Sequence, residues 1–238
     1  CIITTNINQT WASPKTLGAV LNFAKLREFL VAEVESYNGK VCMGCRYTRH
    51  FQEDGKTIVE VRSSDGKKIA VSTEVLVDAT GYARAVIYDK KSRQPQFLTA
   101  VGIEYLIEVE LREYDKYAND LKFFLGHKWM PKGYSWIFPM EAEKQRLKIG
   151  VARFNLEHKQ IVETKPMRWY LKLLIQDYMK LEKYKLIDIH GSTVKYSVGL
   201  KDIYYQDNVI AIGDAVSTIN ILGGEGIRHG CLLYTSDA

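Results

Sequence analysis

Two short apolar segments, each running into an acidic residue close to a glycine, constrain the fold of this chain more than any other feature. Residues 75–79 (Val-Leu-Val-Asp-Ala) lead into Thr-Gly, and residues 209–212 (Val-Ile-Ala-Ile) lead into Gly213 and Asp214. Continuous apolar runs of this length are typical of strands buried in a parallel sheet. More than half of the 238 residues lie between them. We therefore expect two parallel strands of one domain, interrupted by a large insertion.

The segments before and within the insertion have recognisable patterns. Residues 17–37 show the apolar periodicity of a helix, with a stripe made of Leu21, Leu26, Phe29, Leu30 and Val34. Asp-Gly pairs separate three alternating segments and predict a three-stranded antiparallel meander over 41–51, 57–63 and 68–72. The middle of the chain is rich in aromatics and predicts strands at 101–111, 134–139 and 147–154, followed by a helix at 165–183.

Composition places the chain among ordinary globular proteins, with 46% hydrophobic and 26% charged residues. No apolar run approaches the roughly 20 residues of a membrane-spanning helix, and no signal peptide is visible. The net charge of +5 is scattered along the chain, whereas a nucleic-acid footprint clusters. We expect a cytoplasmic protein without a nucleic-acid partner.

The four cysteines are Cys1, Cys42, Cys45 and Cys231. Cys42 and Cys45 form a CxxC inside strand-like sequence, and no second pair has the spacing of a structural zinc site. We therefore expect buried, reduced cysteines and no metal. The chain also lacks an initial methionine, and its apolar pattern breaks at residues 234–238, so we interpret it as a fragment.

The segment around Asp214 is the first candidate for chemistry. In open α/β sheets ligands bind beyond the carboxyl ends of the strands, Gly213 permits close backbone approach, and Asp214 can accept hydrogen bonds from sugar or ribityl hydroxyls. An Asp that only caps the next helix would give the same sequence pattern. Three glycines in four positions follow at Gly223, Gly224 and Gly226. Such a turn exposes N–H groups at a helix start, where negative charge is favoured.

Gly213-Asp214-Ala215 with Asn220 and Gly224-Glu225-Gly226-Ile227 resembles the second FAD motif of the geranylgeranyl reductase family. This family lies within the p-hydroxybenzoate-hydroxylase-like flavoproteins. Residues 133–139 (Gly-Tyr-Ser-Trp-Ile-Phe-Pro) are similar to the family's aromatic substrate-domain strand, and residues 75–81 resemble the strand plus Ala-Thr-Gly of many FAD enzymes. The three motifs occur in the family's order and span most of the chain.

The resemblance implies a mixed α/β fold, in which an FAD-binding Rossmann-like domain lacks its first βαβ unit and carries an inserted antiparallel substrate domain. The implied boundaries are 1–94 for the first FAD-binding part, 95–200 for the substrate domain and 201–238 for the second FAD-binding part. Two departures stand out. Ile221 stands where the family usually has Pro, and no G-x-G-x-x-G motif is present. The fragment alone should therefore bind FAD weakly or not at all.

The resemblance also implies a division of roles. Asp214 would contact the ribityl chain, and Gly223, Gly224, Glu225 and Gly226 would lie along the flavin ring. Asp78 and Gly81 would pass near the dinucleotide. Reduced flavin would deliver hydride to a prenyl double bond, and NADPH is one donor that would recharge it. No catalytic residue is identified.

Trp136 and Phe138 alternate on one face of their strand and are the best candidates for an isoprenoid pocket, although ordinary sheet core explains most of the neighbouring aromatics. A lipid-like substrate makes peripheral membrane association plausible, and the oligomeric state stays open. Two alternatives to the reductase share the scaffold: a flavin monooxygenase or lycopene-cyclase-like enzyme, and a non-enzymatic protein with a degenerate flavin fold.

Overall fold

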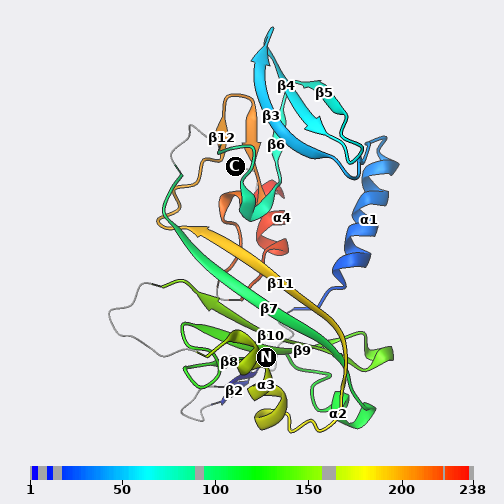
Figure 1. The fold of residues 1–238 in the computed structure, drawn as a ribbon, viewed down its shortest axis with the longest axis vertical. Helices are drawn as coiled ribbons and strands as arrows, with labels where there is room; N and C mark the ends of the chain where they lie inside the picture. The colour runs from blue at the N-terminus through cyan, green and yellow to red at the C-terminus, as the bar shows by residue number, and fades with distance from the viewer. Residues whose placement is uncertain are drawn as a thin grey trace. The chain divides into compact units, whose positions relative to one another are not determined.

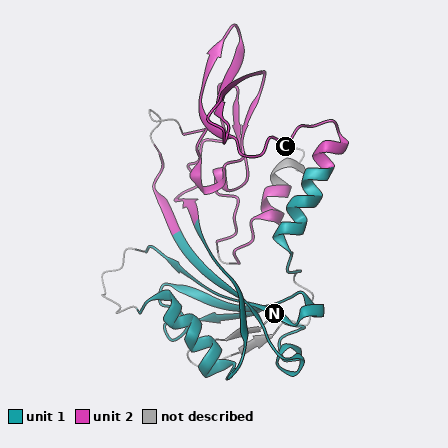
Figure 2. Ribbon diagram, turned by 45° about the vertical axis from the view of Figure 1, so that its right-hand side comes forward, with its two compact units in different colours: residues 1–32, 100–193 teal, residues 33–99, 194–238 magenta. Residues whose placement is uncertain are grey.

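The computed structural model describes residues 2–4, 10–12, 18–88, 94–156, 165–221 and 223–235. The chain divides into two compact units, each built from two separate stretches of sequence (Figure 2). Unit 1 comprises residues 1–32 and 100–193, and unit 2 comprises residues 33–99 and 194–238. The functional assignment of the predicted domains 1–94, 95–200 and 201–238 stays a prediction.

Unit 1 contains most of a seven-stranded sheet (Figure 1). In spatial order the strands are β11 (Lys185–Ser197), β7 (Phe97–Glu108), β10 (Arg146–Phe154), β9 (Gly133–Met140), β8 (Lys122–Leu125), β1 (Ile2–Thr4) and β2 (Thr10–Ala12). The central strands β7, β10 and β9 are antiparallel, and their register pairs Gly150 with both Glu104 and Trp136. The strands predicted at 101–111, 134–139 and 147–154 are confirmed, whereas the patterns did not reveal β11.

One face of this sheet is the hydrophobic core of unit 1. Alternate residues of the central strands, including Ile107, Ile137 and Ile149, are fully buried. They belong to one cluster with side chains of the helix α3 (Met167–Leu173) and of the π-helical turn η3 (Leu174–Tyr178) that follows it. The helix predicted at 165–183 is therefore confirmed in a shorter form. The short helix α2 (Leu111–Asp115) contributes Tyr114 to the same cluster.

Unit 2 contains two three-stranded sheets. The antiparallel meander consists of β3 (Arg46–Glu53), β4 (Lys56–Arg62) and β5 (Lys68–Thr73), which confirms its prediction. In the other sheet β13 (Val209–Ala211) runs parallel to β6 (Leu76–Asp78) and antiparallel to β12 (Tyr205–Gln206). The two apolar segments thus pair directly, as parallel strands of one sheet. The turns η1 (Gly81–Ala83) and η4 (Gly213–Val216) follow β6 and β13, and the helix α4 (Ile227–Thr235) follows η4.

Other details differ from the sequence interpretation. The CxxC lies in a turn before β3, not inside a strand. Cys42, Cys45 and Cys231 are exposed, so the expectation that they are buried was wrong. The turn leaves the thiols of Cys42 and Cys45 outside the alternating pattern that buries strand side chains, whereas Cys231 lies on α4. Cys1 lies outside the described residues. The helix α1 (Phe23–Ser36) forms as predicted, but none of its residues is buried.

Candidate functional site

The ends of β6 and β13 bring two glycine-containing turns to the same edge of their sheet. Asp78 pairs with Ala211 in parallel register, and the N–H of Ile212 donates to the Asp78 carbonyl at 3.0 Å. Beyond this point Gly81 and Gly213 both have positive φ, 64° and 58°. Apart from their chain neighbours, no described residue has an atom within 4 Å of where a Cβ would stand on either glycine. The backbone is therefore bare at the carboxyl edge, where ligands bind in open α/β sheets.

The Asp78 carboxylate is fully buried and organises the turn that follows β6. Its Oδ1 accepts hydrogen bonds from the Thr80 N–H at 2.9 Å and the Thr80 hydroxyl at 2.6 Å. Its Oδ2 accepts from the N–H groups of Val86 and Ile87 at 3.1 and 2.8 Å. Four donors already satisfy this carboxylate, so its side chain holds the loop. The predicted proximity of Asp78 and Gly81 to the dinucleotide stays a prediction.

Asp214 has the opposite character. Its side chain lies on η4 and is half-buried, and among the described residues no donor bonds to its carboxylate. Burial raises the pKa of the Asp214 carboxyl, and the charge of Arg84 offsets part of that rise. A Cβ placed on Gly226 would stand 3.5 Å from Asp214 Oδ1. The structure thus brings Asp214 and Gly226 together, and the carboxylate has free capacity to accept a ligand hydroxyl.

The glycine-rich turn before α4 is closed by Asn220. The N–H of Gly224 donates to the Asn220 carbonyl at 2.8 Å, and the N–H of Gly223 donates to Asn220 Oδ1 at 3.3 Å. The Asn220 N–H in turn donates to the Glu225 carbonyl at 2.8 Å. Two glycine N–H groups expected to face a ligand are therefore used inside the turn. The N–H of Gly226 has no acceptor within the described part of the chain.

The sequence interpretation missed a buried arginine beside this segment. Arg84 is 2% exposed and forms an ion pair with Asp202 at 3.4 Å. One of its Nη atoms donates to the Ser217 hydroxyl at 2.8 Å and to the Lys195 carbonyl at 3.3 Å, and its guanidinium lies 4.4 Å from the centre of the Phe97 ring. Arg84 therefore holds the end of η4 in place. A single Arg among apolar residues gives no local sign of such a contact, because its partners are distant in sequence.

The predicted pocket residues Trp136 and Phe138 lie on the face of the unit 1 sheet opposite the α3 core. Both are half-buried, whereas Ser135 before Trp136 and Ile137 between the two are fully buried. The rings of Trp136 and Phe138 are nearly parallel, with centroids 6.2 Å apart, and Tyr134 and Phe123 extend the group. These four side chains are called the aromatic face below. Its role as a substrate pocket stays a prediction.

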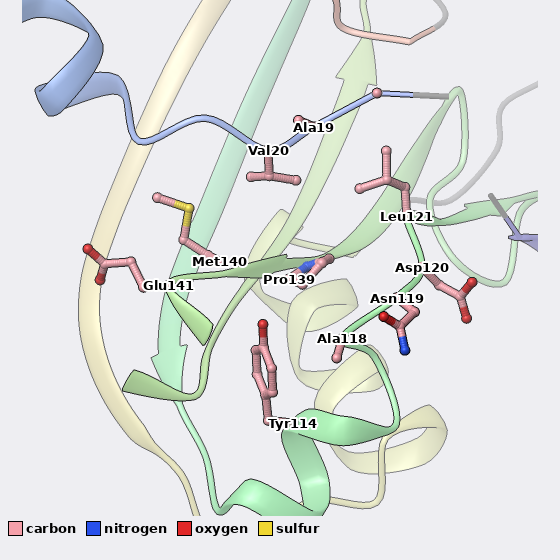
Figure 3. A pocket seen from close by; sticks show the side chains of 11 residues that line it. Ala19, Val20, Tyr114, Ala118, Asn119, Asp120, Leu121, Pro139, Met140 and Glu141 are labelled. Atoms are coloured by element: carbon pink, nitrogen blue, oxygen red, sulfur yellow. The ribbon is translucent and has the colours of Figure 1, made fainter. Parts of the chain in front are cut away.

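A hollow of about 310 Å³ lies where β9 ends (Figure 3). Tyr114, Leu121 and Met140 line it, and the Tyr114 hydroxyl points toward Pro139. Burial raises the pKa of Tyr114. Glu141, at its rim, is held by Arg146 at 2.6 Å and by the Asn22 amide at 3.2 Å. Trp136 and Phe138 do not line this hollow, so it is separate from the aromatic face.

Within the described ranges, no group of three or more His, Cys, Asp or Glu side chains is arranged to hold a metal ion. No described helix is both long enough and apolar enough to cross a membrane. The expectation of no metal site stays a prediction.

Comparison with known proteins gives the geometry a family context. Residues 102–194 match the family model of the geranylgeranyl reductase catalytic domain. The chain is 30% identical over 226 residues to a digeranylgeranylglycerophospholipid reductase of Haloferax volcanii, a match that covers 88% of this chain and 52% of that protein. A second enzyme of this name, from Methanothermobacter thermautotrophicus, is 22% identical, with 91% and 53% covered. The chain thus spans about half the length of these relatives.

Solved structures agree on the fold. A geranylgeranyl bacteriochlorophyll reductase-like protein of Thermoplasma acidophilum superposes with a TM-score of 0.74 at 19% identity, over 98% of this chain and 58% of that chain. A flavoprotein/dehydrogenase of Cytophaga hutchinsonii gives 0.70 at 12% identity, over 96% and 57%. The predicted fold class is therefore confirmed as a mixed α/β fold interrupted by an antiparallel sheet, and these two structures share it.

Proposed function

We propose that the chain is part of a member of the geranylgeranyl reductase family, an FAD-dependent oxidoreductase that reduces double bonds of a prenyl chain. The observation that carries the proposal is the position of the aromatic face. Tyr134, Trp136, Phe138 and Phe123 all lie within the stretch that matches the family's catalytic domain. They present apolar rings on a sheet face that α3 does not cover.

The residues at the edge of the β6–β13 pair fit a flavin. Asp214 offers an unsatisfied, half-buried carboxylate, which suits the hydroxyl groups of the ribityl chain. Gly213 leaves room for a ligand against the backbone, and the free N–H of Gly226 stands beside Asp214 at the start of α4. The positive end of that helix favours negative charge on a ligand. Bound FAD would supply the hydride chemistry there.

The substrate would lie on the aromatic face. Apolar rings bind a branched hydrocarbon by removing its surface from water, at roughly 25 cal/mol per Å² of apolar area. The substrate class we propose is an isoprenoid chain attached to a lipid. We also propose NADPH as the electron donor and peripheral association with a membrane, and we assign no residue to either role.

Product analysis of the full-length protein tests this function. The purified enzyme, reduced either by NADPH or chemically, is incubated with a geranylgeranyl-bearing glycerophospholipid, and the lipid is analysed by mass spectrometry. We expect a mass gain of two hydrogen atoms for each double bond reduced. Gain of an oxygen atom would favour a monooxygenase, and cyclisation without mass change would favour a cyclase-like enzyme. An unaltered lipid would contradict all three enzymatic interpretations.

A further inference from the structure

The Trp136 ring lies flat against the backbone of the neighbouring strand. A Cβ placed on Gly150 of β10 would stand 2.0 Å from Cζ2 of the indole, so the ring occupies the space that any side chain at this position would need. On β7, a Cβ on Gly102 would come within 3.9 Å of Cη2. Gly150 therefore opens a slot for the indole, whereas a Cβ at Gly102 would only touch the edge of the ring. The ring extends from its own strand, β9, across β10 toward β7.

Glu104 fixes the indole in that slot. Its Oε2 accepts a hydrogen bond from Trp136 Nε1 at 2.8 Å. Its other oxygen, Oε1, lies 3.2 Å from Lys148 Nζ and 3.2 Å from His190 Nε2. The far side of the imidazole, Nδ1, lies 3.4 Å from the Asp188 carboxylate. Four strands, β9, β7, β10 and β11, thus meet at one carboxylate.

The burial of these groups indicates a built arrangement. The Glu104 side chain is 12% exposed and that of Lys148 is 17% exposed, whereas His190 is 52% exposed at the rim. A carboxylate this far from water is costly unless cations and donors surround it. The indole N–H makes the same demand, because a buried donor without an acceptor is unfavourable. The hydrogen bond between the indole N–H of Trp136 and the Glu104 carboxylate therefore satisfies both groups at once.

We propose that Glu104 is a positioning residue, which holds the Trp136 indole flat as the floor of the prenyl-chain site. This inference rests on the proposed function, since it assigns a role within the same aromatic face. The ring has one face against Gly150, and its other face continues the surface of Tyr134 and Phe138. Loss of the acceptor frees the indole to rotate out of the slot and breaks that surface.

Kinetics of the full-length enzyme test the assignment with a matched control. Glu104→Leu removes the acceptor at similar size, and Glu104→Gln keeps a carbonyl oxygen for the indole. Glu108 lies on the same strand and face, but pairs with Arg146 at 3.3 Å and not with Trp136. We expect Glu104→Leu to raise KM for the prenyl lipid about tenfold at unchanged kcat. Glu104→Gln should recover most of the loss, and Glu108→Leu should behave as wild type.

A double-mutant cycle separates positioning from general damage. In a Trp136→Phe background the indole N–H is gone, so Glu104→Leu should have no further effect on KM. If Glu104→Leu raises KM equally in both backgrounds, or if Glu108→Leu has the same effect, Glu104 does not act through Trp136 and the proposal is overturned. Equal flavin content in all variants shows that the cofactor region is unaffected.

A spectral measurement keeps this inference distinct from the function itself. The near-ultraviolet circular dichroism of Trp136 is obtained by subtracting the spectrum of Trp136→Phe. We expect Glu104→Leu to abolish that contribution and Glu104→Gln to preserve it, with or without turnover. A wild type that reduces no prenyl lipid but shows this pattern contradicts the proposed function and leaves the Glu104–Trp136 contact standing. A Trp136 contribution unchanged in Glu104→Leu overturns the positioning role even in an active enzyme.

Discussion

The two units bury their interiors in different ways. The core of unit 1 is a cluster of eighteen buried apolar and aromatic residues on one sheet face. The core around the β6–β13 pair of unit 2 holds seven buried apolar residues and, in the same unit, the buried charges Asp78, Arg84 and Asp202. The contrast teaches that unit 1 is stabilised mainly by packing, whereas unit 2 also depends on the ion pair and hydrogen bonds of its buried charged groups. The candidate cofactor edge lies in unit 2, and the aromatic face lies on the packed sheet of unit 1.

The strongest test of this contrast is the removal of Arg84. Arg84→Met leaves Asp202, whose side chain is fully buried, without its cation, and also breaks the hydrogen bond to Ser217. Loss of one partner of a buried pair costs about 3–5 kcal/mol. We expect a loss of this size in the free energy of unfolding, measured by urea denaturation. The double variant Arg84→Met/Asp202→Leu should recover much of it. A double variant less stable than the single one would contradict a stability that depends on pairing.

The corresponding test in unit 1 changes packing alone. Ile149 is fully buried in the core cluster, and Ile149→Ala should lower the free energy of unfolding by about 3 kcal/mol through the cavity it leaves. Lys185, whose side chain is 73% exposed on β11 of the same unit, is the control. Lys185→Ala should cost below about 1 kcal/mol. Equal losses for the two variants in urea denaturation would contradict a stability of unit 1 that depends on its packed core.

Removal of the Asp214 carboxylate tests the role of unit 2 in cofactor binding. Asp214→Ala in the full-length protein should weaken FAD binding by about 1.5–3 kcal/mol, the worth of a hydrogen bond to a charged group. Fluorescence titration of the apoprotein with FAD measures this directly. The fully satisfied Asp78 should behave differently, because its loss disturbs the fold before it disturbs the ligand. Unchanged flavin affinity in Asp214→Ala would place the polyol elsewhere.

The smallest expected effect is the pH dependence of that affinity. Burial raises the pKa of Asp214, so its carboxyl takes up a proton at a higher pH than an exposed Asp does. Flavin affinity should reach its full value at a pH above the raised pKa of Asp214. It should fall as the pH drops through that pKa, because protonation removes the negative charge of the carboxylate that accepts the ribityl hydrogen bond. The folded state also binds this proton more tightly than the unfolded state, so this group's contribution to stability falls as the pH rises through the same window. In Asp214→Asn both trends should disappear.

Local patterns predicted much of this molecule because they depend on neighbouring residues. The apolar runs at β6 and β13, the Asp-Gly turns of the meander and the alternation around Trp136 all act within a few residues. The features that escaped prediction depend on distant partners. Arg84 forms an ion pair with Asp202. The Trp136 indole requires a glycine on β10, which leaves space for the ring, and a hydrogen-bond acceptor on β7. The periodicity of one strand cannot show which residue stands opposite.

The placement of cofactor and substrate is tested most directly by a crystal structure of the full-length protein with FAD and a prenyl lipid. We predict a ribityl hydroxyl within hydrogen-bond distance of the Asp214 carboxylate, and the hydrocarbon chain against the indole of Trp136. FAD bound away from the β6–β13 edge, or a lipid chain that does not touch the aromatic face, would contradict it.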